Sequence, residues 1–156
     1  MNIYEELKWQ LITATQKDKV LKQLPINIQR IWSDRFTKAS VNDYMSILKK
    51  LNSKSYFTEM VHTYVDSIME YLMENPKNQE WFQYTGQKGG STAFVCTQAS
   101  YAKDKQNNTM EFLFFANDLS PLEQAKLTRN INSFQREFLK DKSFTEYVKS
   151  ELTVKT

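Results

Sequence analysis

Hydrophobic and polar positions follow three successive patterns along this chain. Up to about residue 74, apolar residues recur at the i, i+3, i+4, i+7 spacing of amphipathic helices. From residue 79 to 117 the pattern changes to short runs of β-branched and aromatic residues, which is typical of strands. The helical spacing returns after residue 120. This order predicts an α+β fold, with helices first, then a small antiparallel sheet, then helices.

The region before residue 40 predicts short helices. Apolar positions in 5–24 fall into two groups separated by the polar stretch 13–18, so we expect two short helical pieces that end before Pro25. A further short helix should follow. Its apolar face would consist of Ile28, Ile31, Trp32 and Phe36.

Two longer helices are expected next. Ser40, with Asp43 three residues later, resembles a capping box and predicts the start of the first. The apolar face of that helix would be Val41, Tyr44, Ile47, Leu48 and Leu51. The second should run from Thr58 to about Glu74, where Asn75-Pro76 ends it. Its apolar stripe would be Met60, Val61, Tyr64, Val65, Ile68, Met69 and Leu72.

Three strands are expected, at 81–84, 91–97 and 110–115. The polar segment 103–108 should join the last two as an antiparallel hairpin, because a parallel connection needs a longer crossover.

Ser120-Pro121-Leu122-Glu123 is the strongest helix start in the chain, and the helix should reach about Leu139. Ser143 with Glu146 predicts a last helix through Leu152. One long and one short C-terminal helix would then pack on the sheet.

Composition and charge mainly exclude classes of protein. The 156 residues are 40% hydrophobic, which fits a single domain over 1–156 with its own core. The net charge of +3 comes from scattered lysines, so nucleic acid is not an expected partner. The lone Cys96 and the lone His62 form neither a disulfide nor a zinc site, and no cofactor is expected. No apolar run approaches a membrane span, and Met1–Glu6 lacks the features of an export signal.

Glycine usage is the most informative part of the composition. The chain has only three glycines, and they share one five-residue window as Gly86, Gly89 and Gly90. Glycine occurs where the backbone takes a positive φ or approaches another group closely. One interpretation is a tight turn or bulge between two strands, with Lys88 solvated at its tip. A phosphate-binding loop is disfavoured, because no glycine-rich phosphate motif is present and no helix follows.

The same window resembles part of a known enzyme superfamily. Lys88-Gly89-Gly90-Ser91-Thr92, the following segment 93–102 and the strand 111–115 look like the C-terminal part of the penicillin-recognising serine hydrolases. That superfamily holds the class A β-lactamases and related D-alanyl-D-alanine peptidases. In those enzymes a Lys-Thr/Ser-Gly triplet on an inner strand lines the substrate cleft, and a long C-terminal helix covers the sheet. The resemblance covers residues 37–156, with the helix from Ser120 as the C-terminal one.

The resemblance implies a substrate-binding role for the window. Lys88 would supply positive charge for the carboxylate of a β-lactam or a peptide of the D-Ala-D-Ala type, and the Ser91 backbone N–H would help to bind an oxyanion. Gly89 stands where the family has Thr or Ser, so the hydroxyl would come from Ser91 or Thr92. The implied binding set is Lys88, Gly89, Gly90, Ser91 and Thr92. An alternative registration, which we favour less, places the triplet at Tyr84-Thr85-Gly86 and loses the lysine.

The nucleophile of the family has no convincing counterpart here. Ser46-Ile47-Leu48-Lys49 matches the letters of its Ser-x-x-Lys motif, but in the middle of a predicted helix and too close to Lys88 along the chain. Ser40-Val41-Asn42 matches the second motif but precedes Ser46, which inverts the family order. An N-cap and a solvated helix position explain these residues better. We therefore expect a C-terminal portion of an enzyme that is inactive by itself.

A non-catalytic α+β interaction module, with the glycine window as a structural turn, is the alternative. The two hypotheses differ in what they expose: a portion of an enzyme would leave a face of the sheet or of the helix from Thr58 apolar and uncovered, and so favour self-association.

His62 is expected to be a half-exposed structural histidine, and Cys96 a buried, inert thiol. The sequence leaves the compartment open, although the family resemblance would suggest a periplasmic or secreted protein.

Overall fold

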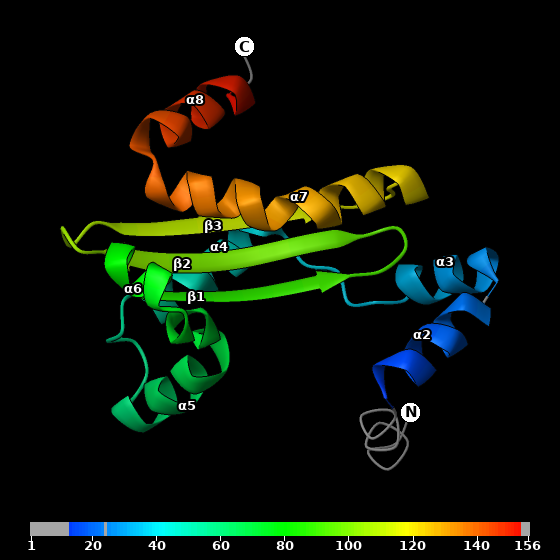
Figure 1. The fold of residues 1–156 in the computed structure, drawn as a ribbon, viewed down its shortest axis with the longest axis horizontal. Coiled ribbons are helices and arrows are strands. Elements are labelled where there is room, and N and C mark those ends of the chain that lie inside the picture. The colour runs from blue at the N-terminus through cyan, green and yellow to red at the C-terminus, as the bar shows by residue number, and fades with distance from the viewer. Residues whose placement is uncertain (1–12, 24, 154–156) are drawn as a thin grey trace. The chain divides into compact units, whose positions relative to one another are not determined.

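The computed structural model describes residues 13–23 and 25–153, and the chain divides into two compact units, residues 1–36 and 37–156 (Figure 1). The described part of the first unit is a pair of helices, α2 (Ala14–Gln23) and α3 (Ile26–Asp34). The second unit begins where the family resemblance begins, and it contains the whole sheet.

The expected break at 13–18 is wrong, because α2 starts there. Thr13 Oγ1 accepts a hydrogen bond from Gln16 N at 3.3 Å, and Gln16 Oε1 accepts one from Thr13 N at 2.8 Å. This reciprocal pair is a capping box, so the polar stretch 13–18 contains the start of α2 and its first turn. The expected helical piece before residue 13 lies outside the described residues, whereas the expected helix after Pro25 is confirmed as α3.

Helix α4 (Val41–Asn52) is confirmed with the predicted start, because Ser40 Oγ accepts a hydrogen bond from Asp43 N at 3.1 Å. The single helix expected from Thr58 to Glu74 is instead divided into α5 (Glu59–Met69) and the 3₁₀ helix η1 (Tyr71–Glu74). A further helix, α6 (Pro76–Trp81), was not expected. Asn75 caps it with Pro76 at its first position, and Asn78 Nδ2 donates to Leu72 O, which ties η1 to α6.

The sheet has three antiparallel strands, as expected, and their order is β1-β2-β3. The strand expected at 91–97 is wrong, because residues 92–95 lie between two strands. The strands are β1 (Phe82–Ser91), β2 (Cys96–Asp104) and β3 (Thr109–Ala116). Strand β1 runs through all three glycines, and the connection to β2 is made by residues 92–95, where Thr92 N donates to Val95 O. The predicted β2–β3 hairpin is confirmed. In it Asn107 has a φ of +67°, and Asp104 Oδ1 accepts hydrogen bonds from Gln106 N and Asn108 N.

Helices cover both faces of the sheet (Figure 1). Helix α7 (Pro121–Lys140) packs on one face over β2 and β3, and α4 packs on the other; α5 and η1 contact β1. The predicted capping box of Ser120 and Glu123 is present at the start of α7. The short helix α8 (Lys142–Leu152) packs on α7, and its N-cap is Asp141 rather than Ser143. The core under α7 consists of Phe82, Ala102, Phe112, Ile131 and Leu139.

Candidate functional site

Strand β1 is an edge of the three-stranded sheet, because it pairs only with β2 among the described strands. The resemblance implied an inner strand, so this position differs from the family pattern. The two halves of β1 have different surroundings. The residues at 85 and 86 are buried, whereas every residue from Lys88 to Ser91 is exposed. The exposed half carries four of the five residues that the resemblance nominated for substrate binding, and Thr92 follows it in the connection to β2.

Each glycine of the window lies directly opposite a β2 residue whose side chain folds over it. Gly86 pairs with Tyr101, Gly89 with Gln98 and Gly90 with Thr97, so the members of each pair share a face of the sheet. A Cβ atom on Gly86 would stand 2.6 Å from the Tyr101 hydroxyl, one on Gly89 2.6 Å from Gln98 Oε1, and one on Gly90 3.1 Å from Thr97 Oγ1. The glycines make room for β2 side chains.

The glycines do not form a turn. None of them has a positive φ, and all three have extended backbone within β1. The expected tight turn is therefore wrong, and close approach is the reason for glycine here. Gln98 is held over Gly89 because Gln98 Nε2 donates to Gln135 Oε1 on α7 at 2.5 Å and to Gln87 Oε1 at 3.1 Å.

Lys88 carries the only charge among the residues nominated for binding. It is exposed, lies opposite the small Ala99, and donates from Nζ to the carbonyl of Gly89 at 2.7 Å. Within the described part of the chain, no carboxylate lies within ion-pair distance of this ammonium. An exposed cation without a carboxylate partner is suited to hold an anionic ligand.

The hydroxyl groups near Lys88 differ in availability. Ser91 is exposed at the end of β1, whereas Thr92 Oγ1 accepts a hydrogen bond from Phe94 N at 3.1 Å within the turn. In the alternative registration the hydroxyl would be that of Thr85. Its side chain is buried and donates to Tyr101 O at 3.0 Å, so it faces no solvent. Of the hydroxyl groups in the two registrations, that of Ser91 is therefore on an exposed residue and that of Thr85 on a buried one.

The Ser-x-x-Lys match is not part of this arrangement. Ser46 and Lys49 are exposed positions in the middle and last turn of α4. Within residues 13–23 and 25–153, no hydrogen bond or ion pair joins Ser46 or Lys49 to Lys88. A serine nucleophile needs a base within hydrogen-bond reach, and the surroundings of Ser46 supply no such contact.

A polar cluster beneath β1 was missed by the sequence reasoning. Lys54 has a φ of +55° and directs its ammonium at two carboxylates, Asp66 Oδ1 at 2.5 Å and Glu70. The same ammonium lies 4.7 Å from the ring centroid of Tyr84 and 5.0 Å from that of Tyr101. The cluster joins the end of α4, α5 and two strands, and it has no sequence signature because its members are far apart in the chain.

The two tyrosines of the cluster stay protonated. Tyr101 is fully buried and donates to Glu70 Oε1 at 3.1 Å, and Tyr84 donates to Asn52 O at 2.8 Å. Burial, followed by the negative charges of Glu70 and Asp66, raises the pKa of both phenols above their ordinary value. These groups therefore act as hydrogen-bond donors rather than as general bases, and the cluster holds β1 and β2 in place against α5.

His62 and Cys96 have structural positions. His62 is 6% exposed, so the expected half-exposed histidine is wrong. Its Nε2 accepts a hydrogen bond from Phe57 N at 3.3 Å, and the Phe57 ring packs on it edge to face. Cys96 is buried as expected, and this burial raises the pKa of its thiol. The described residues contain no group of three or more potential metal ligands.

Comparisons with protein-family models, with curated proteins and with solved structures found no match to this chain. In the described part of the structure, no helix combines the length and the apolar character needed to cross a membrane.

Proposed function

We propose that this chain is the C-terminal portion of a β-lactamase-like serine hydrolase, and that the exposed end of β1 binds the carboxylate of a β-lactam or D-Ala-D-Ala type substrate. The observation that carries the proposal is Lys88, an exposed ammonium on a sheet edge with no carboxylate partner among the described residues. The exposed Ser91 beside it offers a hydroxyl group and the end of the strand to a ligand.

Two further observations support this proposal. The antiparallel sheet is followed by a long helix, α7, that packs on one of its faces, as the family resemblance implies. An edge strand also presents backbone N–H groups that no neighbouring strand uses. Such N–H groups stabilise an oxyanion when they are held rigidly, and the loss of one donor costs about 3 kcal/mol in catalysis.

The proposal assigns no catalytic serine to this chain. Ser46 is exposed on α4 and has no contact with Lys88, so a nucleophile would have to come from residues outside this sequence. We therefore expect no covalent adduct when the protein is incubated with a fluorescent penicillin. Intact-mass measurement and peptide mapping check this, and a stable acyl adduct at Ser46 would contradict the assignment.

Binding at β1 can be tested without catalysis. In an NMR titration with a peptide that ends in D-alanyl-D-alanine, the backbone amides from Lys88 to Thr92 should shift. The same peptide with a C-terminal amide should have a weaker effect, because it lacks the charge that Lys88 recognises. Lys88→Gln should abolish the difference between the two peptides, whereas Lys126→Gln, an exposed position on α7, should preserve it. Equal shifts with both peptides in the wild-type protein would overturn the proposal.

A non-catalytic interaction module is the second candidate, and α5 carries the surface that its partner would contact. Met60, Tyr64 and Ile68 form a row at i, i+4, i+8 on this helix, and all three are exposed. A partner protein would cover this row in a binding module, and the rest of the enzyme would cover it under the first proposal. A module should behave as a monomer or a closed dimer in solution, whereas an enzyme portion should self-associate without closure.

A further inference from the structure

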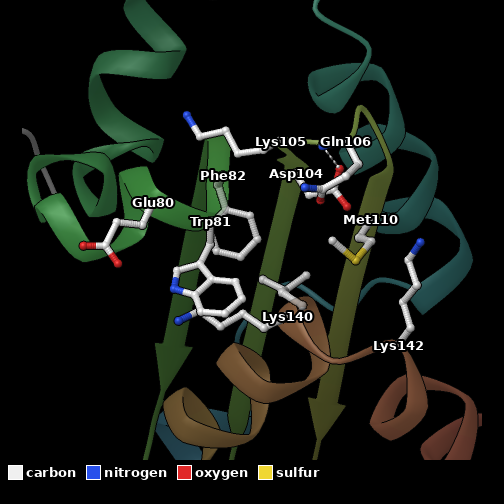
Figure 2. Close-up of a pocket in the computed structure, with 10 residues that line it drawn as sticks. Glu80, Trp81, Phe82, Asp104, Lys105, Gln106, Met110, Lys140 and Lys142 are labelled. Carbon is white, nitrogen blue, oxygen red and sulfur yellow. Dashed lines mark hydrogen bonds between the residues drawn. The ribbon is translucent and has the colours of Figure 1, made fainter.

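A pocket of about 390 Å³ lies beside Phe82, the first residue of β1. Figure 2 shows the residues that line it. Its walls come from the end of α6, the β2–β3 hairpin, the end of α7 and the start of α8. Four segments distant in sequence therefore converge on one cavity. Its volume falls in the range of roughly 300 to 1,000 Å³ that small-molecule sites occupy.

The interior of the pocket is apolar. Phe82 and Leu139 are buried core residues, and Met110 packs beside them. Trp81 extends this surface outward, and its side chain remains half exposed. Figure 2 shows the indole ring of Trp81 next to the ring of Phe82, with Met110 across the cavity. This surface is suited to a planar apolar group, because aromatic rings pack edge to face or offset on one another.

The rim of the pocket is positively charged. It carries Lys105, Lys140 and Lys142, and none of these ammoniums forms an ion pair with a carboxylate of the described residues. Lys140 Nζ lies 4.6 Å from the ring centroid of Trp81, so it borders the apolar surface directly. Three cations around an apolar cavity favour a ligand with negative charge.

Two acidic residues also line the pocket, so three lysines stand against two carboxylates there and one positive charge is in excess. Figure 2 shows the Glu80 carboxylate pointing away from the two aromatic rings. The Asp104 carboxylate accepts hydrogen bonds from Gln106 N at 2.9 Å, Asn108 N at 2.8 Å and Asn108 Nδ2 at 2.6 Å, all within its own hairpin. Its lone pairs are thus largely used by the turn. The carboxylate keeps its negative charge, which acts on Lys142, so the lysines rather than Asp104 are the groups that can bind an anion.

We propose that this pocket binds a small aromatic carboxylate, whose ring lies against Trp81 and whose carboxylate faces Lys140 and Lys142. Neither the resemblance nor the site at Lys88 assigns this role. The pocket borders the start of β1, whereas Lys88 lies in its second half.

The test compares 2-naphthoate with its neutral analogue 2-naphthamide in ¹H–¹⁵N NMR titrations. With the acid, we expect shifts of the Trp81 indole N–H and of the amides of Lys105, Gln106 and Lys142. The amide analogue should bind several times more weakly, because its apolar part is the same and its charge is absent.

Paired lysine variants then locate the charge. Lys140→Gln combined with Lys142→Gln should weaken naphthoate binding about fivefold, since exposed charge pairs each contribute modestly. Lys126→Gln combined with Lys149→Gln removes the same charge from α7 and α8 outside the pocket, and should leave binding unchanged within about twofold.

Three results would overturn the proposal. The first is equal affinity for the acid and the amide, and the second is equal weakening by both lysine pairs. The third is a set of shifts confined to residues 88–92, which would instead place the aromatic acid at the site proposed for the hydrolase substrate. If naphthoate shifts both the pocket amides and the amides of residues 88–92, Lys88→Gln should remove the shifts at 88–92 and keep those at the pocket.

Discussion

Gly86 and Tyr101 face each other across β1 and β2, and the tyrosine ring occupies the space that any side chain at position 86 would need. A Cβ there would stand 2.6 Å from the Tyr101 hydroxyl and 2.8 Å from Cε1, well inside van der Waals contact. Tyr101 has no exposed surface, and its hydroxyl is bound to Glu70. The ring therefore has little freedom to move away.

Gly86→Ala should destabilise the protein by about 1–3 kcal/mol, the usual cost of overpacking a core. Gly90→Ala is the matched control, because its Cβ would stand 3.1 Å from Thr97 Oγ1 at an exposed position, and the expected change is about 0.5 kcal/mol or less. Urea unfolding measures both. Equal midpoints for the two variants would contradict the role given to Tyr101.

Lys54→Met should destabilise the protein by about 1–2 kcal/mol, because Asp66 and Glu70 would face each other without their shared cation. Adding Glu70→Gln to this variant should restore part of the loss by removing one of the two negative charges. Lys49→Met, an exposed position on α4, serves as the control and should change little. If Glu70→Gln deepened the loss, hydrogen bonding rather than charge would be the main contribution of Glu70.

Tyr101 should make stability fall at alkaline pH. Its pKa in the folded protein is raised above the ordinary value of 10.0, first by burial and then by Glu70 and Asp66. Above pH 10 the unfolded chain therefore binds fewer protons than the native state, and the free energy of unfolding decreases as pH rises. Between about pH 9 and 11, the wild-type protein should lose roughly 1.4 kcal/mol more than Tyr101→Phe.

Urea midpoints across this pH range measure the difference. Tyr147→Phe, at a side chain that is 60% exposed, is the matched control variant. Parallel pH curves for the wild type and Tyr101→Phe would show that Tyr101 titrates in the native state as it does in the unfolded chain.

The exposed row on α5 should drive self-association. Met60, Tyr64 and Ile68 are 71%, 68% and 69% exposed, so their apolar surface is open to solvent. Light scattering coupled to size-exclusion chromatography should show a mass that increases with protein concentration. Met60→Lys with Ile68→Lys should lower that mass, whereas Leu122→Lys, at an equally exposed apolar residue on α7, should not. A concentration-independent monomer or dimer would favour the interaction module.

The helix starts could be predicted because their signals are local. Ser40 and Ser120 each contact a residue three positions later, so the capping bonds are specified by neighbours in the chain. Two helix boundaries were predicted wrongly. Helix α5 ends at Met69 and η1 follows, where one helix to Glu74 was expected. The cap of α8 was assigned to Ser143, although Asp141, two residues earlier, accepts the hydrogen bonds of Ser143 N and Phe144 N.

The candidate site was only partly predictable. The lysine and the glycines could be singled out from composition, but the glycines were assigned to a turn because sequence alone does not tell positive φ from close approach. The distinction needs the register of β1 on β2, which places Gly86 opposite Tyr101 and Gly89 opposite Gln98. The pocket around Trp81 had no sequence signal, since its walls come from four separate segments.

The sequence by itself determined the order of the elements, the α+β class and the main helix caps, because periodicity and capping act between residues a few positions apart. Only the tertiary structure decided which charges are paired and which remain open. Lys54 meets Asp66 and Glu70, which lie 12 and 16 positions away, while Lys88 has no carboxylate near it in the described chain. Both are lysines in the sequence, and their different roles follow from what the fold places beside each ammonium.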